Sequence, residues 1–293
     1  MINTKKEISL LFIFTFFVLG ATFISIKSVN PPVFNDPSFL GKHDIVELYG
    51  CNKKILTDLS RLEKVLTKAA HVAGAQKIGH IACQTDDNIN SCIIIVSESH
   101  LSVHAFPLLG YVAVDIFTCG ECDNEKAIAY IEQELQSQSN HHKKIKRGMY
   151  KKKMASSQYA LAKNDQKGEH LIVELSECEE SIINDEKKIE DALKKAVQKA
   201  GGQVIDAVPY KFHPQGVSCI VLAKNGSQIT IHTWPELSQN YCAIDILTCG
   251  NYKPDESFLF LKQALKAKSF QVIKIPRGFS PAGVVERIPS PKL

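Results

Sequence analysis

The sequence predicts an α+β fold in which two repeated units, each an antiparallel sheet with helices on one face, pack as an αββα sandwich. The chain has 293 residues and is 44% hydrophobic, which is enough for one large core or two small domains. A segment that begins at Gly41, GKHDIVELYGC, recurs from Gly168 as GEHLIVELSEC. In each copy, short runs rich in isoleucine and valine outnumber the helical patterns, so each unit should be a sheet with helices covering one face.

The repeat continues along most of the chain. At the same offset of 127 residues, Ser91-Cys92 falls on Ser218-Cys219. After small insertions, DIFTCG at 115–120 matches DILTCG at 245–250. A duplicated pair has pseudo-two-fold symmetry, so sites at the junction should draw residues from both halves. The predicted organisation is a hydrophobic segment and tether (1–40), repeat 1 (41–149), a lysine-rich linker (150–167), repeat 2 (168–279) and a tail (280–293).

The elements of the first repeat follow from its periodicity. Leucine, valine and alanine at three- and four-residue spacing predict a helix over 55–73, which Gly74 should end. A second amphipathic pattern predicts a helix over 125–138. The predicted strands are short and apolar, and they span residues 43–49, 77–83, 92–97, 101–106 and 111–118, with a last one ending near Lys146.

An uncharged stretch lies near the N-terminus. Residues 9–26 contain no charged side chain, and eighteen such residues reach the lower limit for a membrane span. A signal peptide is the alternative, although Leu19-Gly20-Ala21 is a poor match to a cleavage site. We therefore expect a single-pass anchor that associates the protein with a membrane.

Charge and cysteine content bear on the compartment. The net charge of +4 gives no strong nucleic-acid signal, and we expect no nucleic-acid partner. Nine cysteines in a chain of this length are not a disulfide framework, which favours a reducing compartment and a cytoplasmic catalytic body. Lys5 and Lys6 precede the uncharged stretch and favour the opposite side for the body, so the side is left open.

A serine-centred motif lies in the first repeat. Residues 97–104 read SESHLSVH, so His104 follows Ser99 by five residues, and Cys119 follows Ser99 by twenty. Taken singly, a histidine on a strand or a cysteine before a glycine is usually structural. The three elements in this register, however, resemble the small, prokaryotic-type S-adenosylmethionine decarboxylases, and the resemblance covers both repeats.

This resemblance implies a pyruvoyl-dependent enzyme that makes its own cofactor. The Ser99 hydroxyl would attack the carbonyl of Glu98, and elimination from the resulting ester would leave residue 99 as a pyruvoyl group. That ketone forms a Schiff base with a substrate amine and acts as an electron sink when carbon dioxide leaves. Cys119 would then protonate the decarboxylated carbon. Glu98 would also contribute to substrate binding.

The second repeat has lost part of this motif. Residues 226–228 read GSQ where residues 98–100 read ESH, so the glutamate and the histidine beside the serine are both replaced. Ser227 and Cys249 are also twenty-two residues apart, which is out of register with the first repeat. We expect no cleavage in the second repeat.

The resemblance implies composite sites, because in the family's dimers one half supplies the reactive serine and the cysteine. The other half supplies a processing serine, a histidine, and a glutamate that binds the substrate's ribose hydroxyls. The complete site would consist of Ser99, Cys119, Ser218, His232 and Glu236, with His104 as a further catalytic candidate. The opposite set would be Ser227, Cys249, Ser91, His104 and Leu108, which lacks both glutamates. We therefore expect a fused pseudo-dimer with a single working site and no metal.

The expected reaction is decarboxylation of S-adenosylmethionine for spermidine biosynthesis. A pyruvoyl-dependent arginine or ornithine decarboxylase is an alternative, since a carboxylate such as Glu236 can also bind a cationic side chain. A non-catalytic paralogue that activates a partner subunit is a third hypothesis, and it predicts a broken Glu-Ser pair in both repeats. After cleavage, residues 1–98 would stay bound to the catalytic chain, and the pair could form a larger oligomer.

Overall fold

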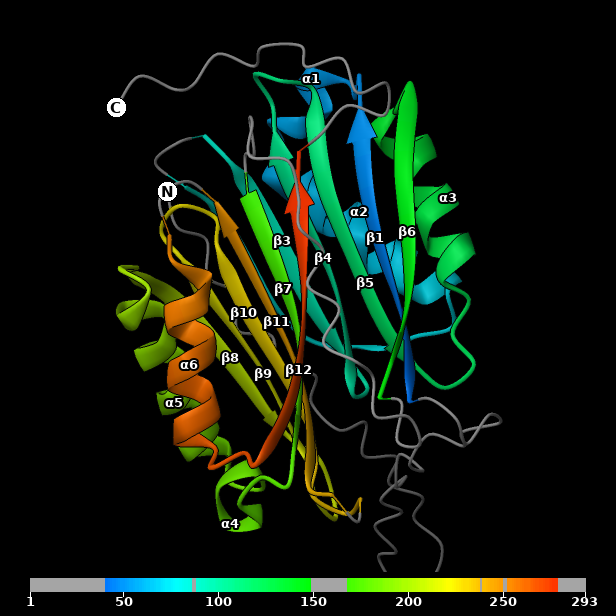
Figure 1. The fold of residues 1–293 in the computed structure, drawn as a ribbon. Helices are drawn as coiled ribbons and strands as arrows, with labels where there is room; N and C mark the ends of the chain where they lie inside the picture. Colours follow the sequence, from blue (N-terminus) through cyan, green and yellow to red (C-terminus); the bar gives the residue numbers. More distant parts are fainter. Residues whose placement is uncertain (1–39, 86–87, 149–167, 238, 250–251, 279–293) are drawn as a thin grey trace, which may run out of the picture.

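The computed structural model describes residues 40–85, 88–148, 168–237, 239–249 and 252–278. Two six-stranded sheets form the body, and every strand pairing in them is antiparallel (Figure 1). The predicted anchor, linker and tail lie outside the described residues. Within the described ranges, none of the helices combines the length and the apolar character that a membrane crossing requires.

The first sheet has the strand order β2-β3-β4-β5-β1-β6. Its strands are β1 (Gly41–Tyr49), β2 (Lys77–Gln84), β3 (Asn90–Val96), β4 (Ser99–Phe106), β5 (Tyr111–Cys119) and β6 (Ser139–Arg147). Its helices are α1 (Lys53–Leu56), α2 (Leu59–Val72) and α3 (Asn124–Leu135). The strands begin and end close to the positions that the short apolar runs predict.

The second sheet repeats this order as β8-β9-β10-β11-β7-β12. Its strands are β7 (Gly168–Ser176), β8 (Val204–Lys211), β9 (Val217–Ala223), β10 (Gln228–Trp234), β11 (Tyr241–Cys249) and β12 (Ser269–Arg277). Its helices are α4 (Glu180–Ile183), α5 (Glu186–Lys199) and α6 (Pro254–Ala264). The internal repeat read from the sequence is therefore a repeat of the whole sheet topology.

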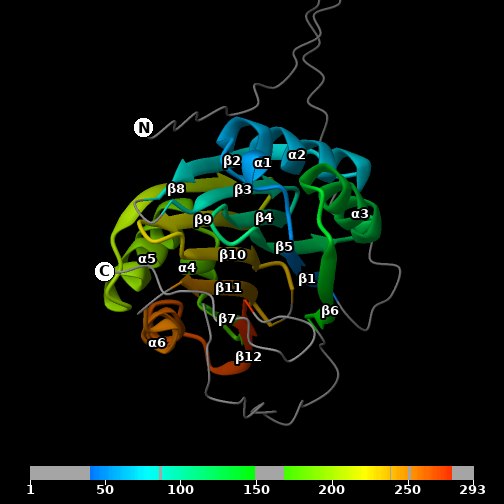
Figure 2. The same cartoon turned by 90° about the horizontal axis from the view of Figure 1, so that it is seen from above.

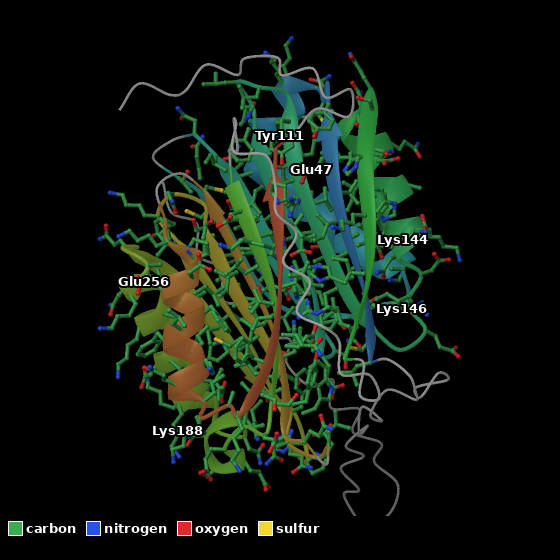
Figure 3. All side chains as sticks on the ribbon, viewed as in Figure 1. Glu47, Tyr111, Lys144, Lys146, Lys188 and Glu256 are labelled. Atoms are coloured by element: carbon green, nitrogen blue, oxygen red, sulfur yellow. The ribbon has the colours of Figure 1, made fainter. Side chains whose placement is uncertain are left out.

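The helices cover the outer faces of the two sheets, and the inner faces of the sheets pack against each other (Figure 2). Each outer layer buries an apolar core between helices and sheet, built around α2 in the first unit and α5 in the second. Lys188 and Glu256, labelled in Figure 3, lie on this outer helical side of the second unit. The predicted αββα sandwich is confirmed.

The helix predicted over 55–73 is interrupted. α1 ends at Leu56, and α2 begins after Asp58, whose carboxylate accepts a hydrogen bond from the backbone N–H of Arg61 at 3.0 Å. An aspartate at this position caps the free N–H groups of a new helix, so the chain starts a second helix there. Gly74 follows the end of α2 with a φ of +88°, as predicted for a helix-ending glycine.

Two buried arginines join the sheets across the interior. Arg147, at the end of β6, pairs with Glu174 on β7, and Arg277, at the end of β12, pairs with Glu47 on β1. Each guanidinium also donates to two backbone carbonyls of the opposite unit. Glu47, labelled in Figure 3 with Tyr111, accepts a further hydrogen bond from the Tyr111 hydroxyl. The two arginine contacts are reciprocal, as in the interface of a two-fold dimer.

Candidate active site

The Glu98–Ser99 peptide bond lies in the turn between β3 and β4. Ser99 is the first residue of β4, and its hydroxyl oxygen accepts a hydrogen bond from the backbone N–H of Cys119 at 2.9 Å. The thiol of Cys119 lies 3.6 Å from the carbonyl oxygen of Glu98. Antiparallel pairing of β4 with β5 brings together these residues, which are twenty positions apart in the sequence.

Glu98 has an unfavourable backbone conformation. Its φ is +49°, in the left-handed region, which costs a residue with a Cβ about 1–2 kcal/mol. In the second repeat the same position is Gly226, with a φ of +81°, and glycine adopts this conformation without a steric penalty. Of the two serine turns, only that of the first repeat carries this strain.

The side chain of Glu98 is buried and is contacted from the second repeat. Only 8% of the Glu98 surface is exposed, and its Oε2 accepts a hydrogen bond from the indole N–H of Trp234 at 3.1 Å. Burial raises the pKa of Glu98 to about 7; the Trp234 hydrogen bond opposes this rise, and the charge of Glu236 adds to it. Glu98 is therefore close to its titration point at neutral pH.

The second sheet supplies a buried serine–histidine pair. Ser218 on β9 and His232 on β10 are opposite each other in register, and Ser218 Oγ lies 2.6 Å from His232 Nδ1. Burial lowers the pKa of His232 well below its ordinary value, so the ring is neutral. Ser218 lies nine residues before Ser227, whereas Ser91 lies eight residues before Ser99. The extra residue lies in the turn between β9 and β10, where it leaves the pairing of Ser218 with His232 intact.

His232 also reaches the first sheet. Its Nε2 lies 2.9 Å from Nδ1 of His100 on β4, and the two rings are stacked with 10° between their planes. His100 is the residue directly after Ser99. The structure thus places His232 and its serine partner from one repeat against the residue that follows Ser99 in the other.

The opposite set has the same geometry with different residues. Ser91 Oγ lies 2.9 Å from His104 Nδ1, and His104 Nε2 lies 3.0 Å from Oε1 of Gln228. Burial lowers the pKa of His104 to about 4. His104 therefore contacts the opposite set, and the structure does not place it in hydrogen-bond contact with the residues around Ser99.

The longer spacing between Ser227 and Cys249 does not change their contact. The backbone N–H of Cys249 donates to Ser227 Oγ at 2.9 Å, the same contact that Cys119 makes with Ser99. The additional residues lie in the turn between β10 and β11, and the strands keep their register. The inference from spacing that the second repeat is out of register is wrong, because an insertion in a turn does not shift a strand pairing.

Cys119 is a protonated thiol at neutral pH. Burial raises its pKa well above the ordinary value, and the charge of Glu98 adds to this effect. A protonated thiol can donate to the carbonyl oxygen of Glu98 in the intact chain, or to a carbon that has gained an electron pair. The Cys119 thiol can therefore act as the proton donor to either of these two atoms.

Glu236 lies on the exposed turn after β10, at the edge of the site. Partial burial raises the pKa of its carboxyl, and the positive charge of Lys211 opposes the rise. The corresponding turn of the first repeat carries Leu108, which is 76% exposed. One edge of the interface therefore offers carboxylates and the equivalent edge offers an apolar side chain.

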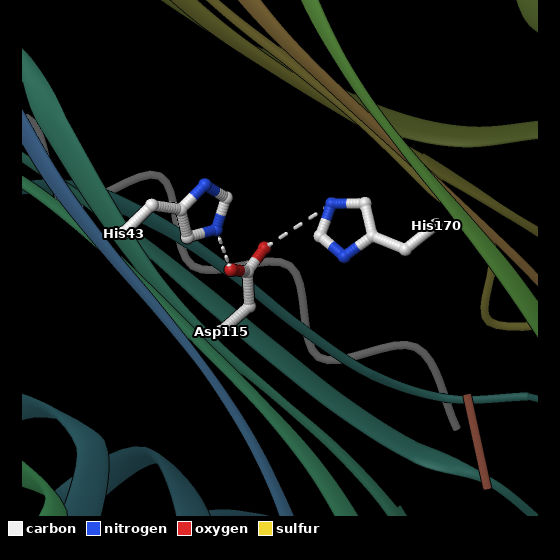
Figure 4. Close-up of side chains that lie close together, drawn as sticks. All are labelled: His43, Asp115 and His170. Carbon is white, nitrogen blue, oxygen red and sulfur yellow. Dashed lines mark hydrogen bonds and ion pairs between the residues drawn. The ribbon is translucent and has the colours of Figure 1, made fainter. Parts of the chain in front are cut away.

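Asp115 on β5 is the centre of a buried polar cluster (Figure 4). Its carboxylate contacts Nε2 of His43, Nε2 of His100 at 3.3 Å and Nε2 of His170 at 3.8 Å. Burial raises the pKa of Asp115, but electrostatic interactions with His43 and His170 and hydrogen bonds with His100 and His43 outweigh it and hold the pKa well below its ordinary value. Asp115 is therefore ionised.

The spacing in this cluster would suit a metal ion, since ligand atoms of His43, Asp115 and His170 lie within 4.8 Å of one another. The hydrogen bonds oppose that interpretation. Arg147 donates to Nδ1 of His43 at 2.9 Å, and Arg277 donates to Nδ1 of His170 at 3.2 Å. An imidazole whose Nδ1 accepts a hydrogen bond carries its proton on Nε2, so neither ring offers a lone pair toward Asp115. The cluster is therefore better described as a hydrogen-bonded ionic network.

Three buried side chains in the site have no role in the sequence interpretation. They are Trp234, His100 and Asp115. The signal that could have found them is the two-residue period of a strand. Trp234 shares a face of β10 with His232, so it points into the same interior and reaches Glu98.

The fold and the site define a tandemly duplicated αββα-sandwich protein with serine-centred sites built between its halves. The family model described as S-adenosylmethionine decarboxylase matches residues 42–148 and 169–278, and the chain belongs to this family. Proteins named S-adenosylmethionine decarboxylase proenzyme from Caldicellulosiruptor saccharolyticus and Carboxydothermus hydrogenoformans are similar to it. The first is 39% identical over 112 residues, which is 38% of this chain and 90% of the relative. The second is 40% identical over 121 residues, which is 41% of this chain and 94% of the relative.

Among solved structures, the adenosylmethionine decarboxylase from Aquifex aeolicus is 27% identical, with a TM-score of 0.36. It covers 40% of this chain and 95% of its own length. The two S-adenosylmethionine decarboxylase proenzymes are matched almost whole by about two fifths of this chain, so each of them corresponds in length to one repeat.

Proposed function

We propose that this chain decarboxylates S-adenosylmethionine with a pyruvoyl group that it makes by cutting itself between Glu98 and Ser99. The observation that carries the proposal is the strained Glu98–Ser99 peptide, whose serine and carbonyl oxygens both contact Cys119. Its relatives bear the name proenzyme, which is consistent with self-processing. In this proposal repeat 1 (41–149) is cleaved and repeat 2 (168–279) stays intact.

Cleavage would begin when Ser99 Oγ attacks the carbonyl carbon of Glu98. A carbon–oxygen bond forms, the peptide carbon–nitrogen bond breaks, and the freed nitrogen takes up the proton that the hydroxyl lost. The Cys119 thiol, 3.6 Å from the carbonyl oxygen, can donate to it as negative charge develops there. Breaking the bond also releases the backbone strain at Glu98.

Elimination would complete the conversion. Loss of the Ser99 Cα proton and of the Glu98 carboxylate breaks the ester, and hydrolytic loss of ammonia leaves the pyruvoyl ketone at residue 99. Ser218 and His232, completing the site from the other repeat, are the proposed proton-handling pair. When formed, the pyruvoyl group supplies the electron sink for loss of carbon dioxide. Cys119, held as a protonated thiol, would donate a proton to the decarboxylated carbon.

S-adenosylmethionine is the substrate best supported by the family and by Glu236. The proposed role of Glu236 and Glu98 is to bind the substrate, with Glu236 accepting hydrogen bonds from the ribose hydroxyls. Arginine or ornithine remains the second candidate, because a carboxylate at this edge could also bind a cationic side chain. The product of the first candidate supplies aminopropyl groups for spermidine.

The partners follow from the cleavage. Residues 1–98 would stay attached to the catalytic chain, since β1 pairs with β5 and β6 across the cut.

We also propose that residues 9–26 anchor this fragment to a membrane, on the basis of their uncharged sequence.

Intact-mass analysis of the purified protein tests the proposal directly. We expect two fragments, one ending at Glu98 and one beginning with a blocked residue 99. Ser99→Ala should remain a single chain, whereas Ser227→Ala, the equivalent change in the second repeat, should be cut like the wild type. A wild-type chain that stays whole would refute the self-cleavage. Release of labelled carbon dioxide from S-adenosylmethionine, arginine and ornithine then identifies the substrate.

A further inference from the structure

A chain of buried hydrogen bonds runs from the site into the polar interior. It starts at Ser218, passes through His232 and His100, and ends at Asp115. The successive separations are 2.6 Å, 2.9 Å and 3.3 Å. All four residues are completely buried, with an exposed fraction of 0%, so water does not compete for these bonds.

The direction of each bond is determined by the carboxylate at the end. Asp115 is ionised and can only accept, so His100 carries its proton on Nε2. His100 Nδ1 is then an acceptor, which requires His232 to donate from Nε2. His232 Nδ1 is left as an acceptor for the hydroxyl of Ser218. The chain thus presents His232 to Ser218 as a base.

Resting on the proposed self-cleavage, we propose that His100 and Asp115 are positioning residues that hold His232 in this tautomer and stabilise it when it takes up a proton. During attack, Ser99 Oγ would give its proton to Ser218 as Ser218 passes its own proton to Nδ1 of His232. His232 then shifts its Nε2 proton toward His100, and His100 shares its own with Asp115. The steps reverse when the Ser99 nitrogen is protonated, so no proton is gained or lost.

The second repeat shows what the chain becomes without His100. Gln228 replaces it, and its Oε1 accepts from Nε2 of His104, so His104 keeps the same tautomer. The amide cannot pass a proton on, and its Nε2 donates to Ser102 at 3.3 Å instead of reaching a carboxylate. Positioning is retained in the opposite set, but the connection to an anion is lost.

Asp245 lacks the hydrogen bond that a histidine at position 228 would donate. It is the counterpart of Asp115 on β11, and Arg147 donates to its Oδ1 at 2.9 Å. Its Oδ2 is buried and has no hydrogen-bond partner among the described residues. In the first repeat the equivalent hydrogen bond to Asp115 comes from His100. An unpaired carboxylate oxygen is expected where a histidine donor has been replaced by glutamine.

Other charged and titratable groups surround His232 and must be considered in any pH measurement. They are His100 on β4, His43 on β1, Arg147 on β6 and Asp245 on β11. His43 is bonded to Asp115 and Arg147, and Arg147 is bonded to Asp245. Replacing His100 alone leaves these other pairs in place.

His100→Gln copies the second repeat and is the main test. We expect the plateau rate of cleavage, followed by intact mass after release from denaturant, to fall by about tenfold to a hundredfold. The midpoint of the acid limb of the rate profile should also move to lower pH, because His232 loses the connection to Asp115 and becomes a weaker base. A role in packing alone would lower the plateau and leave the midpoint unchanged, and this result would overturn the proposal.

Gln228→His is the matched control in the opposite set. It should leave cleavage at Glu98–Ser99 at the wild-type rate and raise Tm, since it offers a donor to Asp245 Oδ2. A loss of cleavage equal to that of His100→Gln would contradict the proposal.

Nitrogen-15 NMR of the imidazoles in the uncut Ser99→Ala chain tests the tautomer of His232 directly and does not depend on whether a variant folds. Finding the His232 proton on Nδ1 would overturn the proposal, whereas an uncut wild-type chain would instead overturn the proposed function.

Discussion

Glu98→Gln should stabilise the uncut precursor in a way that depends on pH. Burial raises the pKa of Glu98 from 4.5 to about 7, with the charge of Glu236 adding to the effect and the Trp234 hydrogen bond opposing it. Between these two pH values the folded chain binds a proton that the unfolded chain has released. The free energy of unfolding therefore falls as pH rises through this window, and it is constant above it.

The expected magnitude follows from the same shift. A tenfold change in proton affinity corresponds to about 1.4 kcal/mol, so ionised Glu98 destabilises the folded precursor by about 3 kcal/mol at pH 8. Glutamine keeps an acceptor for the Trp234 indole and removes the charge. The difference in free energy of unfolding between the glutamine variant and the parent should therefore be about 3 kcal/mol larger at pH 8 than near pH 4, in favour of the variant.

The measurement is urea unfolding at several pH values, with Ser99→Ala as the uncut parent and Ser99→Ala combined with Glu98→Gln as the variant. Trp234, the single tryptophan of the chain, donates to Glu98 and reports the transition by fluorescence. A stability difference that stays constant from pH 4 to pH 8, or that grows toward acid, would show that Glu98 does not titrate as the structure implies.

Three further changes test other parts of the structure. Arg277→Met leaves Glu47 buried without its partner and should lower the free energy of unfolding by about 3–5 kcal/mol; adding Glu47→Gln should recover part of this, and no loss in the single variant would contradict the reciprocal ion pairs. Glu236→Gln should raise the KM for S-adenosylmethionine by about tenfold while cleavage proceeds, because a charged acceptor is worth about 1.5–3 kcal/mol; Leu108→Glu should leave KM unchanged, and an equal effect of both would remove the argument for one site. Cys119→Ser keeps a donor near the Glu98 carbonyl, so it should still be cut, yet it should release labelled carbon dioxide with a turnover at least about tenfold lower; wild-type turnover would exclude the thiol as proton donor.

Local patterns in the sequence were sufficient to predict the fold. Short runs rich in isoleucine and valine located the strands, and the recurrence of GKHDIVELYGC showed that the topology is duplicated. The need to cover one face of each sheet led to the αββα layers. The spacing of Ser99 and Cys119 also indicated the site, through the resemblance to the S-adenosylmethionine decarboxylases that it carries. The structure shows why the spacing matters, since the antiparallel pairing of β4 with β5 brings the two residues together. The break at Asp58 was missed, since one capping aspartate within a continuous helical pattern is a weak signal.

The contacts between the two sheets could not be obtained from the sequence. The bonds from Trp234 to Glu98 and from His232 to His100 join residues more than 130 positions apart, and no periodicity within one strand specifies a partner on another sheet. The left-handed backbone of Glu98 is likewise a property of the folded turn. The sequence by itself determined the repeat, the strands and the choice of Glu98–Ser99 as the candidate cleavage site. Only the packing of one sheet on the other decided which groups surround that pair, because hydrogen bonds and burial across an interface depend on distances that the chain acquires when it folds.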